Sequence, residues 1–418
     1  MSALPSSALP SSAAPSPAHT PVATPSTAAY GTVFPILLAI SLSHMINDTL
    51  QSLIQSLYPM LKDNYALSFA QIGAITLAFQ LTASILQPIV GFYTDRRSMP
   101  YSLTIGMGLT LLGILLMSSA HSYPVILIAA ALVGTGSSIF HPESSRVARM
   151  AAGDRPGFAQ AFFQVGGNTG TAIGPLLAAF IVIPLGQSSV AGFGLLALVG
   201  MVILYMVGSW YKANPGRIKA RSRNVGDVAA LPRRTVVLSI VILVALMFSK
   251  FVYMAALGNY YTFYLISHFG LDVQDAQLLL FVFLGASAVG TIAGGAFSDR
   301  FGLKTVIWIS ILGILPFTLV LPYASLMATA ILAAIIGFIL ASAFSAILVY
   351  AQEILPGNVG LVAGLFFGLA FGLGGIAAAG LGILADATSI EFVFKACSFL
   401  PAIGLFTVFL PNINRKRA

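Results

Sequence analysis

Twelve long apolar runs fill the chain from residue 30 almost to its end. Each is about 20 residues or longer, the length that an α-helix needs to cross the hydrocarbon core of a bilayer, and short polar breaks separate them. The predicted spans are 30–61, 68–94, 99–119, 123–150, 157–184, 189–211, 234–267, 273–298, 304–323, 325–354, 360–385 and 389–411. None shows the alternation of membrane β-strands. The sequence therefore predicts an all-α membrane protein with twelve transmembrane helices.

Composition excludes a soluble globular protein, because only 8% of the residues are charged and 58% are hydrophobic, whereas soluble domains carry about a quarter charged residues. The net charge of +8 does not indicate nucleic-acid binding, because 17 of the 20 Lys and Arg fall on the side of the N-terminus. The positive-inside rule then predicts that both termini are cytoplasmic, with lipid headgroups as partners of the basic side chains.

The polar segments divide the chain into two halves. Residues 1–29 are rich in Ala, Ser, Pro and Thr and carry no Lys, Arg, Asp or Glu, which predicts a disordered tail. Residues 212–233 form the longest internal polar stretch, and we expect them to link two six-helix bundles at 30–211 and 234–411. A basic cytoplasmic tail follows at 412–418. No segment predicts a folded soluble domain or an obligate protein partner.

A short motif occurs once in each half, after the second and the eighth span. It reads GFYTDRR from Gly91 and GAFSDRFGLK from Gly295, and its aspartates, Asp95 and Asp299, lie 204 residues apart. A small residue lets helices touch, and an aspartate with basic neighbours suits a hinge at the membrane surface. DR is a common dipeptide that can simply anchor a loop, but the equivalent positions favour a gate. The predicted gating residues here are Gly91, Asp95, Arg96, Arg97, Gly295, Asp299 and Arg300.

The first span carries a polar stripe. His44, Asn47, Asp48, Gln51 and Gln55 follow one helical face. Asp48 lies 13 residues beyond Pro35, or about 20 Å along a helix, and therefore near the membrane centre. Burial favours the neutral form of a carboxylic acid, so we favour proton binding over a structural carboxylate. The stripe predicts a wet cavity.

The fourth span adds His141, Glu143 and Arg146. With Asp48 and His44, His141 and Glu143 complete the predicted proton-coupling set. Glu143 and Arg146 are three residues apart, so the sequence leaves open whether Arg146 binds substrate or forms an internal ion pair. His141 and Glu143 have no third ligand at a metal-binding spacing, and we predict no metal and no cofactor.

Lys250 in the seventh span is the first candidate for binding a negatively charged substrate, because a lysine deep in a membrane is costly without an anion. A fixed pairing with Asp48 or Glu143 meets the same constraint and stays open. The other predicted substrate-binding residues are polar or aromatic side chains inside spans: Asn47, Gln51, Gln80, Gln87, Gln164, Asn168, Tyr253 and Tyr261. Each amide alone is more often a contact between helices than a ligand.

Twelve spans, a basic central loop and the repeated motif resemble the major facilitator superfamily, whose loop motif is roughly GxxxDRxGRR. The first copy departs from it at Arg97 and Ser98, and the second keeps Gly302 and Lys304. In the fifth span, Gly170, Gly174 and Pro175 resemble the GxxxGP motif of antiporter-type drug exporters, beside their packing role.

Longer stretches narrow this resemblance to bacterial exporters of small phosphonate antibiotics. They are SLSHMINDTLQSLIQSLYPML, VGTGSSIFHPESSRVARM, FQVGGNTGTAIGPLLAA, FSKFVYMAALGNYYTFYL and ASAFSAILVYAQEILPG, in spans one, four, five, seven and ten. The resemblance implies the major facilitator fold and proton-driven export of a small anion. An importer or uniporter of another small organic anion would share nearly all these features. A non-transporting membrane sensor or a membrane enzyme would need a soluble domain or a catalytic cluster.

Overall fold

The structure is a computed structural model that describes residues 31–153, 155–214, 232–355 and 359–412. The predicted tail at 1–29, most of the predicted linker and all but one residue of the predicted basic tail therefore lie outside the described residues. Every regular element in the described ranges is a helix, which confirms the all-α prediction.

The first half of the chain forms the helices that correspond to the first six predicted spans. They are α1 (Phe34–Ser56), α2 (Tyr58–Tyr65), α3 (Phe69–Arg96), α4 (Ser102–Ser118), α5 (Tyr123–Ala151), α6 (Pro156–Leu177), α7 (Ile183–Leu185) and α8 (Gly194–Ala213). A π-helical turn at Ala178–Val182 joins α6 to α7, and a 3-10 helix at Gln187–Phe193 leads into α8. The irregular stretch follows Pro175, which lacks the amide hydrogen that a regular helix needs.

The second half repeats this plan. Its helices are α9 (Arg233–Phe269), α10 (Val273–Phe301), α11 (Leu303–Ile311), α12 (Leu315–Val320), α13 (Leu326–Ala341), α14 (Ala343–Ile354), α15 (Val359–Ala387) and α16 (Ile390–Cys397). The predicted ninth span is divided into α11 and α12, and the twelfth continues from α16 as a 3-10 helix at Leu400–Phe409. Prolines at Pro316 and Pro401 stand at these changes.

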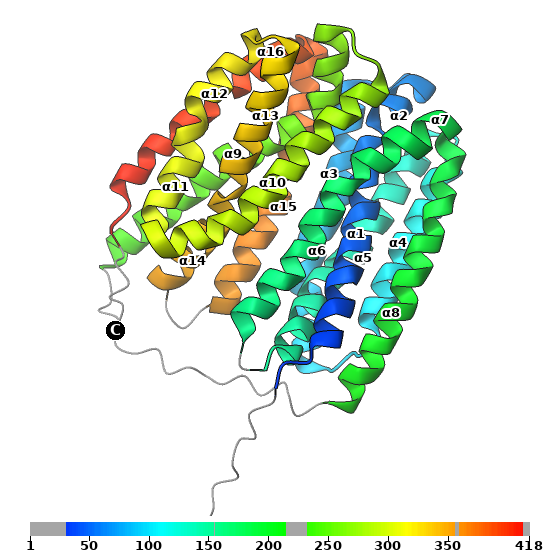
Figure 1. The fold of residues 1–418 in the computed structure, drawn as a ribbon, viewed down its shortest axis with the longest axis vertical. Helices are drawn as coiled ribbons and strands as arrows, with labels where there is room; N and C mark the ends of the chain where they lie inside the picture. Colours follow the sequence, from blue (N-terminus) through cyan, green and yellow to red (C-terminus); the bar gives the residue numbers. More distant parts are fainter. Residues whose placement is uncertain (1–30, 154, 215–231, 356–358, 413–418) are drawn as a thin grey trace, which may run out of the picture.

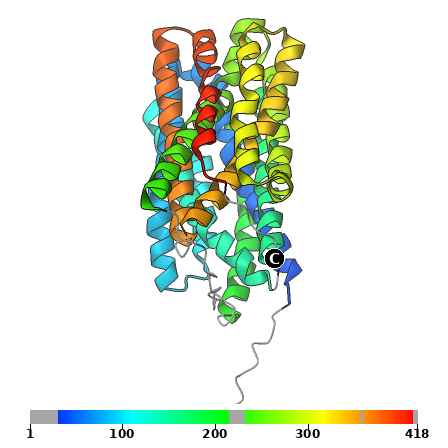
Figure 2. The ribbon, with the colours of Figure 1, turned by 90° about the vertical axis from the view of Figure 1, so that its left-hand side faces the viewer.

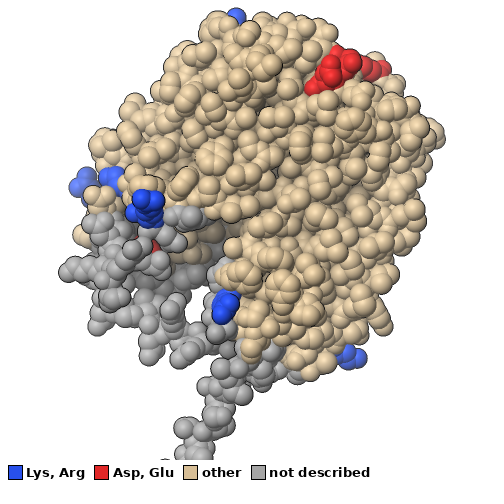
Figure 3. Space-filling model, viewed as in Figure 1, with Lys and Arg blue, Asp and Glu red and all other residues tan. Residues whose placement is uncertain are grey.

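Ten helical segments in the described ranges are long and apolar enough to cross a membrane, and the 17-residue α4 is a shorter apolar helix. The 23-residue α1 completes the twelve crossings, because it is long enough to span although its polar stripe lowers its hydropathy. Figure 3 shows a broad face that is almost free of charged side chains. Lys and Arg lie chiefly along its left and lower edges, and an acidic patch lies at its upper right. Large exposed apolar side chains such as Leu195 and Val202 suit contact with lipid.

The two halves form two six-helix bundles that lie side by side, α1–α8 on the right of Figure 1 and α9–α16 on the left, and Figure 2 shows the second half from the front. Contacts between the halves run chiefly along α3 against α15 and α6 against α10. We call the end that carries α2, α7 and the start of α16 the distal end, and the end where α1 begins the terminal end.

Candidate functional site

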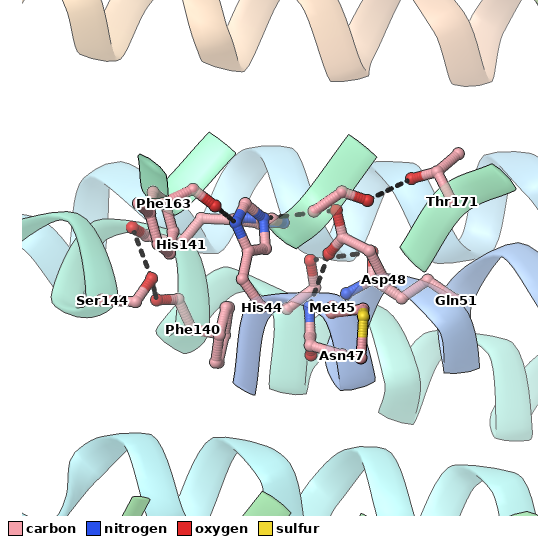
Figure 4. A network of polar contacts seen from close by, with 12 residues as sticks. His44, Met45, Asn47, Asp48, Gln51, Phe140, His141, Ser144, Phe163 and Thr171 are labelled. Atoms are coloured by element: carbon pink, nitrogen blue, oxygen red, sulfur yellow. Dashed lines mark hydrogen bonds and ion pairs between the residues drawn. The ribbon is translucent and has the colours of Figure 1, made fainter. Parts of the chain in front are cut away.

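The best-defined polar cluster lies on α1, where His44 and Asp48 are four residues apart and therefore share a helical face. His44 Nε2 is 3.2 Å from Asp48 Oδ2, and Asn47 Nδ2 donates to Asp48 Oδ1 at 3.0 Å. The His44 ring stacks on Phe163 of α6 with centroids 4.0 Å apart. Figure 4 shows the pair enclosed by α1, α5 and α6. The His44–Asp48 part of the polar stripe thus faces the interior of the first half, whereas Gln55 lies 3.5 Å from Asn259 of the second half.

The geometry of the pair suits one exchangeable proton. His44 Nδ1 is 2.9 Å from the Phe163 carbonyl oxygen, which can only accept, so Nδ1 must carry a hydrogen. In the metal-free pair, the contact between Nε2 and Asp48 Oδ2 then takes one more proton, either as imidazolium with carboxylate or as imidazole with carboxylic acid. Without it, a lone pair would face a negative oxygen. The observed arrangement therefore matches a pair loaded with one exchangeable proton.

His141 of α5 approaches the same pair. Its ring centroid lies 5.4 Å from that of His44 and 5.9 Å from that of Phe371 on α15, and its Nε2 is buried without a hydrogen-bond partner among the described residues. Ligand atoms of His44, Asp48 and His141 all lie within 4.8 Å of one another, so these residues could hold a metal ion. Sequence spacing missed this convergence because the three groups come from two helices.

Glu143, the fourth predicted proton-coupling residue, is part of a different contact. Arg146 Nε lies 3.5 Å from Glu143 Oε1, and the Arg146 guanidinium donates to the Thr94 carbonyl oxygen at 2.6 Å. This is the internal ion pair that the sequence left open, at the end of α3 beside the first DR motif. A role for Arg146 in substrate binding stays a prediction.

Glycines of α6 bring its backbone against α1. A Cβ added at Gly170 would lie 2.2 Å from the Met45 carbonyl oxygen, and one at Gly174 would lie 2.4 Å from Ser52 Oγ. Only residues without a side chain permit this approach. The predicted GxxxGP segment is thus a close packing surface in the structure, whereas its part in gating stays a prediction.

Gly167 touches the His44–Asp48 pair itself, which gives a testable consequence. A Cβ there would lie 2.4 Å from His44 Nε2 and 2.8 Å from Asp48 Oδ2. We expect Gly167→Ala to lower the free energy of unfolding by about 1–3 kcal/mol, because overpacking must push the pair aside. The matched control is Gly258→Ala, where a Cβ meets no atom within 4 Å. Thermal unfolding in detergent should separate the two variants, and equal midpoints would contradict this packing.

Lys250 lies in the second half, buried at 5% exposure. Its Nζ is 5.2 Å from the ring centroids of both Phe251 and Phe344. Among the described side chains no carboxylate lies within ion-pair distance of it, since Asp48 contacts His44 and Glu143 contacts Arg146. The alternative of a fixed pair with Asp48 or Glu143 is therefore not what the structure has. The ring of Phe344 packs on Phe367, which lies one helical turn from Phe371.

The predicted substrate-binding amides gather in the first half, and most have a polar atom without a partner among the described residues. Gln51 accepts from Ser137 at 3.4 Å through its oxygen. The buried atoms that lack a partner are Asn47 Oδ1, Gln51 Nε2, Gln80 Oε1, Gln87 Nε2 and Asn168 Nδ2. Gln164 is half-buried. Buried polar atoms of this kind are normally satisfied by water or by a ligand.

Tyr253 and Tyr261 lie elsewhere, buried within the second half. The Tyr261 ring is 6.4 Å from that of Phe394 on α16, and both tyrosines are almost fully enclosed. Their neighbours Asn259 and Tyr260 lie at the boundary with the first half instead. Asn259 accepts from Thr76 at 2.6 Å. The Tyr260 hydroxyl donates to the Ala378 carbonyl oxygen of its own half at 2.5 Å and lies 3.4 Å from the Phe69 carbonyl oxygen of the first half. The sequence signal for these two was the run of polar residues GNYY, but periodicity did not say which of them faced the partner half.

The gating motifs are described only in part. The structure does not describe the side chains of Asp95, Arg96 and Asp299, and it does not describe the surroundings of Gly295. Arg97 reaches the hydroxyl of Tyr93 at 3.4 Å, and the Arg300 guanidinium lies 5.4 Å from the Phe301 ring. A Cβ on Gly91 would meet no described atom within 4 Å, and the part of this glycine in gating stays a prediction.

Two hollows among the described residues lie away from these clusters. One of about 550 Å³ runs along the start of α9 at Arg233 and Arg234. The other, of about 230 Å³, lies at the distal end between the halves, lined by residues such as Lys62 and Phe263. Neither is lined by a predicted site residue, so the wet central cavity expected from the polar stripes stays a prediction.

Comparison with known proteins extends over the same elements. The family model described as Major Facilitator Superfamily matches residues 40–379 and 242–418. The fosmidomycin resistance protein of Escherichia coli (strain K12) is 58% identical over 398 residues, which cover 94% of this chain and 97% of that protein. The MFS-type transporter YfnC of Bacillus subtilis (strain 168), described as uncharacterized, is 41% identical over 389 residues, 92% of this chain and 95% of that one.

Solved structures share the fold at low sequence identity. A crystal structure of the nucleoside transporter NupG covers 90% of this chain and 100% of its own, with a TM-score of 0.71 and 12% identity. A bacterial homolog of the human lysosomal transporter Spinster, in an inward-facing and occupied conformation, covers 90% of this chain and 94% of its own, with a TM-score of 0.70 and 14% identity. Given the match of the family model and the long, close relatives, the chain belongs to the major facilitator superfamily of membrane transporters.

Proposed function

We propose that the chain is a secondary active antiporter that exports fosmidomycin-like small anionic phosphonates in exchange for protons. The relative that is 58% identical over almost the whole chain is named for fosmidomycin resistance, which supports the cargo class. The observation that supports the proton coupling is the His44–Asp48 pair, whose contacts suit one shared proton. Exchange needs proton and cargo to favour different states, because a ligand bound equally by both moves nothing.

The cargo site is proposed to lie between the two halves. A phosphonate offers strong acceptor oxygens, and a cation with neutral donors is the complement that such a group needs. Lys250 supplies the cation from α9, and the unpartnered amide nitrogens of Gln51, Gln87 and Asn168 supply donors from the first half. The aromatic rings beside Lys250 exclude water and strengthen its attraction for an anion.

The proposed orientation places the terminal end in the cytoplasm of a bacterial inner membrane. It is supported by the 17 of 20 basic residues on that side of the predicted topology. The basic side chains would contact lipid headgroups there. The two DR motifs would close this end when the halves rock about the central site and the distal end opens.

Inverted membrane vesicles test the proposal. With a proton gradient, acid inside, vesicles that contain the protein should accumulate labelled fosmidomycin, and a protonophore should abolish the accumulation. A chelator in all samples removes metal bound at the histidines. A second small anion that lacks the phosphonate group serves as the cargo control. Uptake that only equalises the inside and outside concentrations, with or without the gradient, would identify a uniporter. Cargo that leaves with the protons would identify an importer. Either result would overturn the antiport proposal.

A further inference from the structure

A carboxylate at the distal end joins the two halves. Asp386, close to the end of α15, accepts hydrogen bonds from the backbone amides of Phe69 at 2.8 Å and Ala70 at 2.7 Å. These are the first two residues of α3, in the other half. The first amides of a helix have no partner within it and form the positive end of its dipole. Asp386 therefore completes a helix end that belongs to the opposite half.

The backbones of α3 and α15 touch directly beneath this contact. A Cβ on Gly382 would lie 2.2 Å from the Phe69 carbonyl oxygen, and one on Gly73 would lie 2.3 Å from the Ala378 carbonyl oxygen. The two glycines allow an approach that no larger residue permits. Because the two helices are held this closely, Asp386 is carried to the amides by the packing and not by a flexible loop.

Further hydrogen bonds continue the junction into the molecule. Asn259 of the second half accepts from Thr76 at 2.6 Å, and Gln277 donates to the Ser56 carbonyl oxygen at 2.7 Å. Thr76, Asn259 and Gln277 are buried, whereas Asp386 is exposed. Towards the terminal end, Ser84 of the first half donates to the Gly368 carbonyl oxygen of the second half at 2.7 Å. Asp386 is thus the outermost member of the junction.

We infer that Asp386 is the latch of the distal gate, a residue that holds the halves together at this end and releases them in each transport cycle. Water can replace Asp386 at the amides and solvate the carboxylate when the halves part, so the contact is reversible. An exposed contact of this kind is weak enough to break in each cycle, whereas a buried ion pair would leave two uncompensated charges. The inference concerns the conformational equilibrium and does not depend on the identity of the cargo.

Thiol labelling of the purified protein tests the latch. Cys397→Ser removes the native cysteine, and Ser56→Cys places a reporter in the buried junction next to Gln277. In this background we expect Asp386→Ala to raise the rate of maleimide labelling about tenfold. Loss of one helix cap destabilises the closed state, so the population of open molecules rises by about the same factor. Asp386→Asn keeps one acceptor oxygen and should give an intermediate rate.

The matched control is Asp272→Ala. Asp272 is also an exposed aspartate at the distal end and accepts from the first turn of a helix, Asp275 N at 2.7 Å, but within its own half. Its labelling rate should equal that of the parent. Equal rates for Asp386→Ala and the parent, or an equal rise in Asp272→Ala, would overturn the latch. Size-exclusion profiles report folding, and if Asp386→Ala misfolds, the comparison of Asp386→Asn with Asp272→Ala decides.

Discussion

Asp48→Asn is expected to reduce gradient-driven export of fosmidomycin by about 100-fold, near the upper end of typical coupling between two sites. Asparagine keeps the shape of the side chain but cannot bind or release a proton, so His44 loses the carboxylate that shares its exchangeable proton. Exchange of labelled for unlabelled cargo across the same membrane needs no net proton movement and should persist. Uptake and exchange in the same vesicle preparation separate the two effects.

The control for this variant is Asp63→Asn, which removes an exposed carboxylate at the distal end. It should export at the normal rate. If Asp48→Asn also exports normally against a gradient, another group carries the proton. Glu143 then becomes the first candidate, because it is the other carboxylate of the predicted set and is buried.

Lys250→Gln should weaken the binding of fosmidomycin by roughly 10- to 100-fold, the effect expected for one hydrogen bond that involves a charged group. A general defect in folding would lower the affinity too, but it would also lower the free energy of unfolding. Loss of a cargo contact alone would not lower it. Removal of a buried cation without a carboxylate partner relieves its desolvation, so the free energy of unfolding of the cargo-free protein should stay equal or rise. Isothermal calorimetry and thermal unfolding of the same sample provide both values.

Lys395→Gln is the matched control, because Lys395 is an exposed lysine that lies over the Tyr323 ring. Its affinity for cargo should equal that of the parent. Lys250→Arg retains the charge and should restore part of the affinity. Undiminished binding by Lys250→Gln would remove Lys250 from the cargo site, whereas lower stability together with lower affinity would assign it a structural role.

The spans were predictable because the bilayer imposes a length and a composition on every crossing. The sequence also predicted which residues of one helix share a face, as in the stripe that holds His44 and Asp48. The periodicity of one helix does not predict how that helix is rotated relative to its neighbours. This rotation depends on how all the helices pack together. The approach of His141 to the pair, and the contact of Gly167 with it, were therefore beyond the reach of the sequence.

The same limit explains the tyrosines of α9. The sequence predicts Tyr253 and Tyr261 as binding residues because they are aromatic side chains inside a span. In the structure they contact the interior of their own half, while Asn259 and Tyr260 lie against the other half. The sequence does not predict the contact of Asp386, because its partners are the backbone amides of Phe69 and Ala70. Every residue other than proline has such an amide, so the side chains there give no indication of the contact. Long-range contacts to the main chain leave no pattern in a single sequence.

The most direct measurement of the central claim is proton movement driven by cargo alone. Proteoliposomes with a trapped pH indicator and no initial pH gradient should show protons moving against the direction of an imposed fosmidomycin gradient. The movement should be lost in Asp48→Asn and kept in Asp63→Asn. Protons that move together with the cargo, or that still move in Asp48→Asn, would contradict coupling through the His44–Asp48 pair.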